Sequence, residues 1–305
     1  MKVFVTGASG HLGSAVVPEL LRAGHTVVGL ARSEAAAATL KASGAGVWRG
    51  DLNDLDGLSR AAIEADGVIH LAYRHDVAFS GAPDGFAQAA RIDLEVTQVL
   101  GRALEGSGKP LVTTAGTALA LLHGESRKVS EDDTLPEGPR IDAENLTVSL
   151  AAKAVRSAVV RLAPSVHSTL DHHGFLAMLV ALARKNGFAA FIGEGENVWN
   201  AVHTLDAAHL YRLVLEAAPA GSRWHAVAEE ALPFRDIAET IGSRLGLATR
   251  SLRPEEAPTY FGAFLSFARM NCPASSLHTR NALDWTPTHN TLLEDLAGEH
   301  YFRAS

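Results

Sequence analysis

The chain has 305 residues, of which 47% are hydrophobic and 20% charged, with a formal net charge of −7 at pH 7. This is the composition of a soluble globular protein, and its negative balance excludes the broad positive field that nucleic-acid binding requires. The single cysteine, Cys272, excludes an intramolecular disulfide, and the longest apolar run, Phe175–Ala183, is too short to span a membrane, so we expect a cytoplasmic protein without a membrane partner.

The first half of the chain alternates strands and helices. The predicted strands are Lys2–Thr6, Thr26–Leu30, Gly46–Arg49, Gly67–Ala72, Pro110–Thr114 and Ser157–Leu162. The predicted helices are His11–Ala23, Glu34–Ser43, Asp51–Ala65 (capped by Asp51 or Asn53), Gly85–Leu104 and Asp142–Ala154. Strands separated by helices of this length imply crossover units and a parallel sheet. We therefore predict an α/β fold with a doubly wound parallel sheet and helices on both faces.

The second half is less regular and is interrupted by prolines. Helices are predicted at Phe175–Lys185, Ala207–Ala217 and Phe234–Leu245. Phe261, Phe264 and Phe267 occur at helical spacing and are expected in a core. We expect residues 1–165 to form the sheet domain and residues 166–305 mainly a smaller C-terminal substrate lobe, with segments around 197–230 returning to the first domain.

A glycine-rich loop, Gly7-Ala8-Ser9-Gly10-His11-Leu12-Gly13, lies between the first predicted strand and the first predicted helix. Glycines permit a tight turn, close approach of the backbone to phosphate oxygens, and close packing of helix against strand. The start of the helix supplies free amide groups and the positive end of a dipole for a pyrophosphate. In this context the motif predicts a Rossmann domain that binds a dinucleotide through Gly7, Ser9, Gly10, His11, Leu12 and Gly13.

Residues at the ends of the following strands indicate which dinucleotide binds. Arg32-Ser33 stands where an NAD enzyme carries an acidic residue, and a guanidinium favours the 2′-phosphate of NADP. The alternative is that Arg32 is a solvated surface residue, and the nearby Glu34 weakens the NADP interpretation. The carboxylate of Asp51, beside Leu52, can accept a hydrogen bond from adenine, although it can also be only a helix cap. Leu71-Ala72 is expected beside the cofactor ribose and pyrophosphate.

Several segments together resemble the short-chain dehydrogenase/reductase superfamily. They are the glycine loop, Asp51-Leu52, Val68-Ile69-His70-Leu71-Ala72 and Leu111-Val112-Thr113-Thr114-Ala115-Gly116. The chain also resembles the extended branch of NAD-dependent epimerase/dehydratase-like proteins, through its length and through Arg161-Leu162-Ala163-Pro164, Ala201-Val202-His203-Thr204-Leu205-Asp206 and the segment 279–287. The resemblance covers essentially the whole chain. Because relatives commonly dimerise through their fourth and fifth helices, a homodimer is one expectation.

The resemblance implies roles for residues after the fifth and sixth strands. A hydroxyl residue polarises the substrate carbonyl in that family, and Thr114, with Thr113 beside it, matches the position. The alternative is that β-propensity alone places two threonines at a strand end. Pro164 and Val166 match the place where relatives hold the nicotinamide amide.

The chain departs from the family at its proton donor. The family uses a tyrosine followed four residues later by a lysine, and this chain has no lysine at that offset from Tyr73, Tyr211, Tyr260 or Tyr301. Arg140 and Glu144, spaced four apart at the start of a predicted helix, are expected to occupy the vacated place. Arg140 would polarise a carbonyl or bind a carboxylate, and Glu144 would orient Arg140 or exchange a proton. The alternative is an ordinary surface ion pair.

Other candidate residues lie in loops at the carboxyl end of the predicted sheet. Tyr73 and His75 follow the fourth strand, and either can replace the missing proton donor. His167, Trp199 and His203 are candidates for the substrate pocket, with packing as the alternative, and Asp206 is expected to cap the following helix. The run Asp171-His172-His173 is not expected to bind a metal, because adjacent histidine side chains point apart.

Three functions remain open on the sequence. The first is an NADP-dependent oxidoreductase, with NAD as a less favoured cofactor, acting on a small carbonyl or alcohol. The second is an epimerase or dehydratase that uses a bound dinucleotide transiently. The third is a dinucleotide-binding sensor or scaffold, suggested by the absent Tyr-Lys pair.

Overall fold

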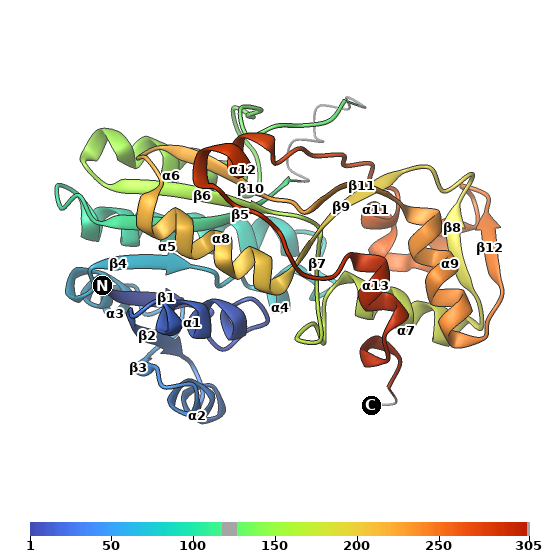
Figure 1. Ribbon diagram of the computed structural model, residues 1–305, viewed down its shortest axis with the longest axis horizontal. Helices are drawn as coiled ribbons and strands as arrows, with labels where there is room; N and C mark the ends of the chain where they lie inside the picture. Colours follow the sequence, from blue (N-terminus) through green and yellow to red (C-terminus); the bar gives the residue numbers. More distant parts are fainter. Residues whose placement is uncertain (118–126, 304–305) are drawn as a thin grey trace.

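The computed structural model describes residues 1–117 and 127–303, and its largest unit is a seven-stranded parallel sheet (Figure 1). The strand order is β10-β6-β5-β4-β1-β2-β3. The strands are β1 (Lys2–Thr6), β2 (Thr26–Ala31), β3 (Gly46–Arg49), β4 (Gly67–His70), β5 (Pro110–Gly116), β6 (Arg156–Leu162) and β10 (Ser222–Ala226). The order reverses between β1 and β4, and ligands of such sheets bind at the carboxyl ends of the strands at this point.

Helices cover both faces of this sheet. They are α1 (Gly13–Arg22), α2 (Glu34–Ala42), α3 (Leu55–Glu64), the short α4 (His75–Ala78), α5 (Gly85–Leu104), α6 (Ile141–Ser149) with the turn η2 (Leu150–Lys153), and α8 (Thr204–Ala217). Helices α1 and α8 pack together, as do α3, α5 and α6. Alternation along β1 separates the two cores, because Val3 and Val5 join the α1–α8 core while Phe4 joins the α3–α5 core. The doubly wound fold predicted from the sequence is confirmed.

The start of α3 differs from the prediction. Helix α3 begins at Leu55 because the Asp54 side chain accepts a hydrogen bond from the amide of Gly57, which makes Asp54 the cap. The expectation that Asp51 or Asn53 caps this helix is therefore wrong. The Asp51 carboxylate instead accepts a hydrogen bond from the Asn53 amide within the preceding turn.

The C-terminal lobe is built from short elements around a second core, at the right in Figure 1. Its strands are β7 (Ser165–His167), β8 (Ala189–Ile192), β9 (Val198–His203), β11 (Glu229–Pro233) and β12 (Thr249–Leu252). Its helices are α7 (Phe175–Asn186), α9 (Phe234–Leu245), α10 (Ala257–Phe261), η3 (Gly262–Phe264), α11 (Leu265–Ala268), α13 (Leu292–Ala297) and η4 (His300–Phe302). Helix α12 (Leu277–Leu283) instead packs on β10 and α8 of the first sheet (Figure 1). Strand β10 and helix α8 also come from this half of the chain, yet they complete the first sheet. In the described parts of the chain, no helix has the length and apolar character needed to span a membrane.

Candidate active site

The loop between β1 and α1 is folded so tightly that only glycine fits at its ends. Gly7 has φ +67°, and a Cβ on it would lie 2.8 Å from the backbone nitrogen of Ala72. A Cβ on Gly13 would overlap the carbonyl oxygen of Gly7 and the backbone of Ala8. No side chain caps α1. The amide groups and dipole of this helix therefore suit an anionic pyrophosphate, and the loop fits the dinucleotide expected from the sequence.

Two histidine contacts tie this loop to the second half of the chain. The Nε2 atom of His11 lies 2.8 Å from the hydroxyl oxygen of Thr204, the first residue of α8. The Nδ1 atom of His11 lies 4.0 Å from Asp171 Oδ1. Burial lowers the pKa of His11, and the nearby Asp171 carboxylate opposes that shift. The His11 side chain therefore anchors the loop, which leaves the backbone amide groups to bind a dinucleotide.

The region beside the end of β2 presents a positive charge. The side chain of Arg32 is 71% exposed, and its Nη1 lies 3.9 Å from an oxygen of Asp76. Glu34, which on the sequence weakens the NADP interpretation, is paired with Arg49 at 2.5 Å. Ser33 accepts a hydrogen bond from Ala36 and so caps α2. Arg32 is thus exposed at the carboxyl edge of the sheet, with the nearest acidic neighbour in sequence neutralised by another arginine.

The carboxyl ends of β4 and β5 bring together four of the candidate catalytic residues. The Arg140 guanidinium donates a hydrogen bond of 2.7 Å to the backbone oxygen of Thr114 and lies 4.1 Å from the centroid of the Tyr73 ring. The His75 ring lies 5.1 Å from that of Tyr73. Arg140 has φ +67°, a left-handed conformation that costs a non-glycine residue about 1 kcal/mol or more. The fold therefore holds this arginine in a strained position beside the phenol.

A buried polar chain, absent from the sequence interpretation, lies behind Arg140. Asp93 on α5 is 5% exposed, and its Oδ2 lies 3.8 Å from Arg140 Nε. Its Oδ1 lies 3.3 Å from Nε2 of His70, whose Nδ1 is 2.6 Å from the Thr6 hydroxyl. Asp93 is an acidic residue on the buried side of α5, and this break in the apolar pattern was the sequence signal that would have identified it.

The surroundings of Tyr73 and His75 shift their pKa values in opposite directions. Burial raises the pKa of Tyr73, an effect that Asp93 reinforces and the Arg140 charge opposes. The protein around the His75 ring desolvates it, and together with the Arg140 charge this lowers the pKa of His75, although the residue reaches the surface. At neutral pH, Tyr73 therefore keeps its proton and His75 is uncharged.

The hydroxyl groups of Thr113 and Thr114 are engaged within the fold. The Thr114 hydroxyl donates to the backbone oxygen of His70 at 2.9 Å and lies 2.7 Å from the hydroxyl of Tyr211, which is fully buried on α8. Thr113 is 4% exposed, and its hydroxyl lies 3.0 Å from that of Thr147. The clearest contribution of Thr114 to the site is its backbone oxygen, which holds Arg140.

The expected pair of Arg140 and Glu144 is not formed. Arg140 precedes α6 in a left-handed conformation, so the spacing rule for two residues within one helix does not apply to it. Glu144 is 5% exposed and forms ion pairs with Arg161 and with Arg223, the latter at 2.6 Å. Burial raises its pKa, but the two arginines outweigh this and leave the pKa of Glu144 lowered. Glu144 is therefore a buried counter-ion, and neither orients Arg140 nor faces a substrate.

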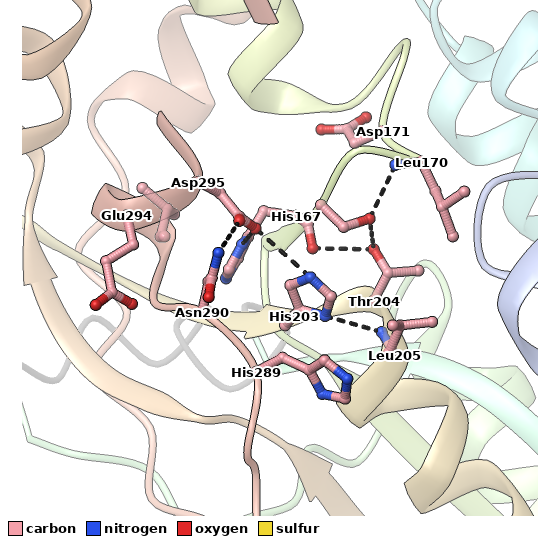
Figure 2. A network of polar contacts seen from close by, with 12 residues as sticks. His167, Leu170, Asp171, His203, Thr204, Leu205, His289, Asn290, Glu294 and Asp295 are labelled. Carbon is pink, nitrogen blue, oxygen red and sulfur yellow. Dashed lines mark hydrogen bonds and ion pairs between the residues drawn. The ribbon is translucent and has the colours of Figure 1, made fainter. Parts of the chain in front are cut away.

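Trp199 and His167 were expected to line the substrate pocket, and this expectation is wrong because both side chains are completely buried. Trp199 is 0% exposed in the second core, where its indole nitrogen donates to the backbone oxygen of Phe267. His167 is also 0% exposed, and its Nδ1 lies 2.7 Å from Asp295 Oδ2 (Figure 2). Both residues position the C-terminal lobe and have no surface left for a substrate.

His203 and Asp206 hold the C-terminal segment against α8. The Nδ1 atom of His203 accepts a hydrogen bond from the Leu205 amide, so His203, and not Asp206 as expected, caps this helix (Figure 2). Asp206 accepts hydrogen bonds from the amides of Thr288 and His289. Burial lowers the pKa of His203 to about 4, which keeps the ring neutral at physiological pH.

His203, Asp206 and His289 have ligand atoms close enough to suggest a metal site. The two imidazole rings are stacked, with centroids 4.7 Å apart and planes inclined by 7°. Nitrogen lone pairs lie in the ring plane, so two stacked parallel rings cannot both direct a lone pair at one ion. We assign these residues to packing of the C-terminal segment.

Comparison with known proteins places these features in context. A model of the NAD-dependent epimerase/dehydratase family matches residues 3–226. An uncharacterised protein of Schizosaccharomyces pombe is 43% identical over 302 residues, covering 99% of this chain and 100% of its own. The decarboxylating sterol-4-alpha-carboxylate 3-dehydrogenase of Dictyostelium discoideum is 26% identical, covering 82% of this chain and 78% of its own. The structure of the NAD-bound dTDP-glucose 4,6-dehydratase of Streptomyces venezuelae matches this chain with a TM-score of 0.76 at 19% identity. The match covers 97% of this chain and 95% of the dehydratase.

Proposed function

The chain belongs to the NAD-dependent epimerase/dehydratase family, and from this premise we propose that it is an NADP-dependent oxidoreductase acting on a small carbonyl compound or the corresponding alcohol. The observation that carries the proposal is the placement of Tyr73 against Arg140 at the carboxyl end of the sheet, next to the glycine loop. The Arg140 charge opposes the effect of burial on the pKa of Tyr73, and so acts in the same direction as the lysine of the missing Tyr-Lys pair. The Dictyostelium relative, named as a dehydrogenase, is consistent with this chemistry.

The residues that would hold NADP follow from the geometry of the loop. The tight turn between Gly7 and Gly13 leaves the start of α1 for the pyrophosphate. The exposed guanidinium of Arg32 would bind the 2′-phosphate. Positions expected along the rest of the cofactor are Ser33, Asp51, Leu52, Leu71, Ala72, Thr113, Pro164 and Val166. When bound, the cofactor supplies hydride to a carbonyl carbon or accepts it from an alcohol.

The residues of this chain manage the charge and the proton on the substrate oxygen. Arg140 binds that oxygen and stabilises the negative charge that develops on it. The phenol of Tyr73 donates its proton to the same oxygen, and in the reverse direction takes it back. Because its pKa is raised, Tyr73 holds this proton at neutral pH. His75, whose pKa is lowered, is the poorer donor. Asp93 and Thr114 orient Arg140.

The proposal is tested by Tyr73→Phe and Arg140→Gln, assayed for NADPH oxidation with a panel of ketones and aldehydes. We expect each variant to lose roughly 100-fold or more in kcat, a typical effect of removing a general acid or an oxyanion ligand, while its Kd for NADPH stays within about twofold of wild type. His75→Asn is the matched control, and a loss confined to that variant would transfer the donor role to His75. Unchanged turnover in all three variants would refute the proposed site.

Two other functions make different predictions in the same assay. An epimerase or dehydratase would retain its dinucleotide through purification and convert substrate without net consumption of NADPH. A sensor or scaffold would bind NADPH and turn over no carbonyl in a broad panel, and Tyr73→Phe would change nothing. We favour the oxidoreductase because the Tyr73–Arg140 contact adjoins the expected cofactor site.

A further inference from the structure

A continuous set of rings leads away from Tyr73. The His75 ring lies 5.1 Å from that of Tyr73 and is stacked 6.3 Å from that of Phe79. The Phe79 ring is 5.1 Å from Phe86 at the start of α5, and both lie about 6 Å from Phe267 on α11 of the C-terminal lobe. We call these five residues the aromatic row. It joins the candidate proton donor to the second lobe.

Two members of the aromatic row are exposed in a way that is unusual for phenylalanine. Phe79 is 38% exposed and Phe86 is 46% exposed, and they are among the few exposed large hydrophobic side chains in the described residues. Single exposed hydrophobic residues are common, but two rings in mutual contact form an apolar patch. Their exposed faces adjoin the candidate site, where they offer apolar surface to a ligand.

Both ends of the aromatic row are fixed. At one end the Arg140 guanidinium lies over the Tyr73 ring. At the other end Phe267 packs 4.6 Å from Phe175 and 5.4 Å from Phe264, which belong to the core of the C-terminal lobe. The exposed phenylalanines therefore have defined positions between the site for the reacting oxygen and the second lobe.

The charged groups beside the aromatic row are paired with each other. Arg74 forms two hydrogen bonds with Asp76, of 2.8 and 2.9 Å, and Arg32 Nη1 lies 3.9 Å from the same carboxylate. The bidentate pair lowers the pKa of Asp76 and keeps it ionised. A phosphate or sugar lying along the row would meet phenyl rings and an already satisfied ion pair. An apolar group would cover the rings and exclude water from them.

We propose that the aromatic row binds the apolar body of the substrate, so that the substrate class is a ketone or aldehyde, or the matching alcohol, carrying an aromatic ring or an alkyl chain of several carbons. This inference rests on the proposed oxidoreductase function. The carbonyl oxygen lies at Arg140 and Tyr73, and the apolar body extends along Phe79, Phe86 and Phe267.

The test uses methyl ketones of increasing chain length, from butan-2-one to decan-2-one, with saturating NADPH. Each methylene buried on the row raises kcat/KM by about fourfold, chiefly through KM, until the chain passes the last ring. Phe86→Ala and Phe79→Ala reduce the advantage of decan-2-one over butan-2-one about tenfold. Ile63→Ala, which removes an exposed hydrophobic side chain on α3, is the matched control and leaves the dependence on chain length unchanged.

The outcomes separate this inference from the function on which it rests. Turnover with no dependence on chain length, or a preference for sugar carbonyls, overturns the inference and leaves the oxidoreductase in place. If no carbonyl is reduced, the NADP-saturated protein is titrated with decan-2-one by calorimetry. Binding of decan-2-one that is weakened by Phe86→Ala but not by Ile63→Ala supports the aromatic row as a binding surface without supporting the oxidoreductase. If Phe86→Ala instead dissociates a dimer, as sedimentation would show, and leaves the chain-length dependence intact, the row is a contact between copies and the inference is wrong.

Discussion

At the scale of single residues, Arg140 and Glu144 show how local geometry overrides a spacing rule. Four-residue spacing brings two side chains together only when both lie in one helix. Arg140 precedes the helix with φ +67° and turns toward Tyr73 and Asp93. Glu144 lies on the buried side of α6, where it forms ion pairs with Arg161 and Arg223. The two residues therefore have different partners, and only Arg140 belongs to the proposed site.

Glu144 is expected to matter for stability. Replacing it with glutamine leaves Arg161 and Arg223 without their buried counter-charge, which costs about 3–5 kcal/mol in the free energy of unfolding. Urea denaturation at pH 7 measures this loss. Glu137→Gln, at an exposed position before the same helix, is the control and changes the free energy by about 0.5 kcal/mol or less. A loss for Glu144→Gln as small as that of the control would contradict the account.

Arg140 is expected to affect turnover more than stability. Glycine suits its left-handed conformation, and this gain partly offsets the loss of the cation beside the buried Asp93 carboxylate, so Arg140→Gly lowers the free energy of unfolding by less than Glu144→Gln does. The same change removes the guanidinium, and kcat falls roughly 100-fold. Asp284→Gly, at another left-handed position, is the control that preserves turnover. Retained turnover in Arg140→Gly would show that the strain serves no catalytic purpose.

At the scale of elements, sequence patterns predicted the sheet well and the second lobe poorly. The strands before and after the glycine loop were recognisable because β-branched runs alternate with helices ending at glycines such as Gly24. The strands β7, β8, β11 and β12 were not predicted, because runs of three to five residues show too little alternation to be recognised. Trp199 was assigned to a pocket because nothing local shows that β9 is covered by residues of α7 and α11.

Only part of the candidate site could be predicted, chiefly the residues that directly follow a strand. Tyr73 was identified because it follows β4. Arg140 was identified through its spacing from Glu144, a pair that is not formed, and the structure instead brings Arg140 to Tyr73. Asp93 and His70 were missed because their contact joins a helix to a strand across more than twenty residues. The burial of His167 likewise depends on Asp295, which lies 128 positions away in the sequence.

The junction of β1 and α1 gives a prediction at this scale. In Gly13→Ala the added methyl would overlap the Gly7 carbonyl, so α1 must move away from the loop. We expect the Kd for NADPH to rise about tenfold or more, because the amide groups of the helix start no longer converge on the pyrophosphate. Gly24→Ala, at a glycine with φ +83° and open space around it, is the control: it costs some stability but leaves Kd unchanged. Equal affinity in both variants would contradict a pyrophosphate site in this loop.

At the scale of the whole molecule, buried neutral histidines make stability depend on pH. Burial lowers the pKa of both His203 and His225 to about 4 in the folded protein, against 6.5 for the free side chain. Between these values the unfolded chain binds protons that the folded chain does not, so stability is full above pH 6.5 and declines as the pH falls toward 4.

Each histidine is expected to contribute up to about 3 kcal/mol to this decline, which denaturation at a series of pH values measures. His203→Asn keeps an acceptor for the Leu205 amide and removes the titration, so it flattens the profile between pH 6.5 and 4. His173→Asn, at an exposed position, leaves the profile as in wild type. A decline that His203→Asn does not reduce would refute this assignment.

The central claim, that the Gly7–Gly13 loop and Arg32 form a working NADP site, is tested most directly by paired titrations with NADPH and NADH. Fluorescence quenching of the four tryptophans, in protein shown to be free of retained cofactor, gives both Kd values. We predict binding of NADPH at least about tenfold tighter than of NADH, reversed in Arg32→Asp and preserved in the exposed control Arg60→Asp. Binding of neither dinucleotide, or a preference unchanged by Arg32→Asp, would contradict the claim.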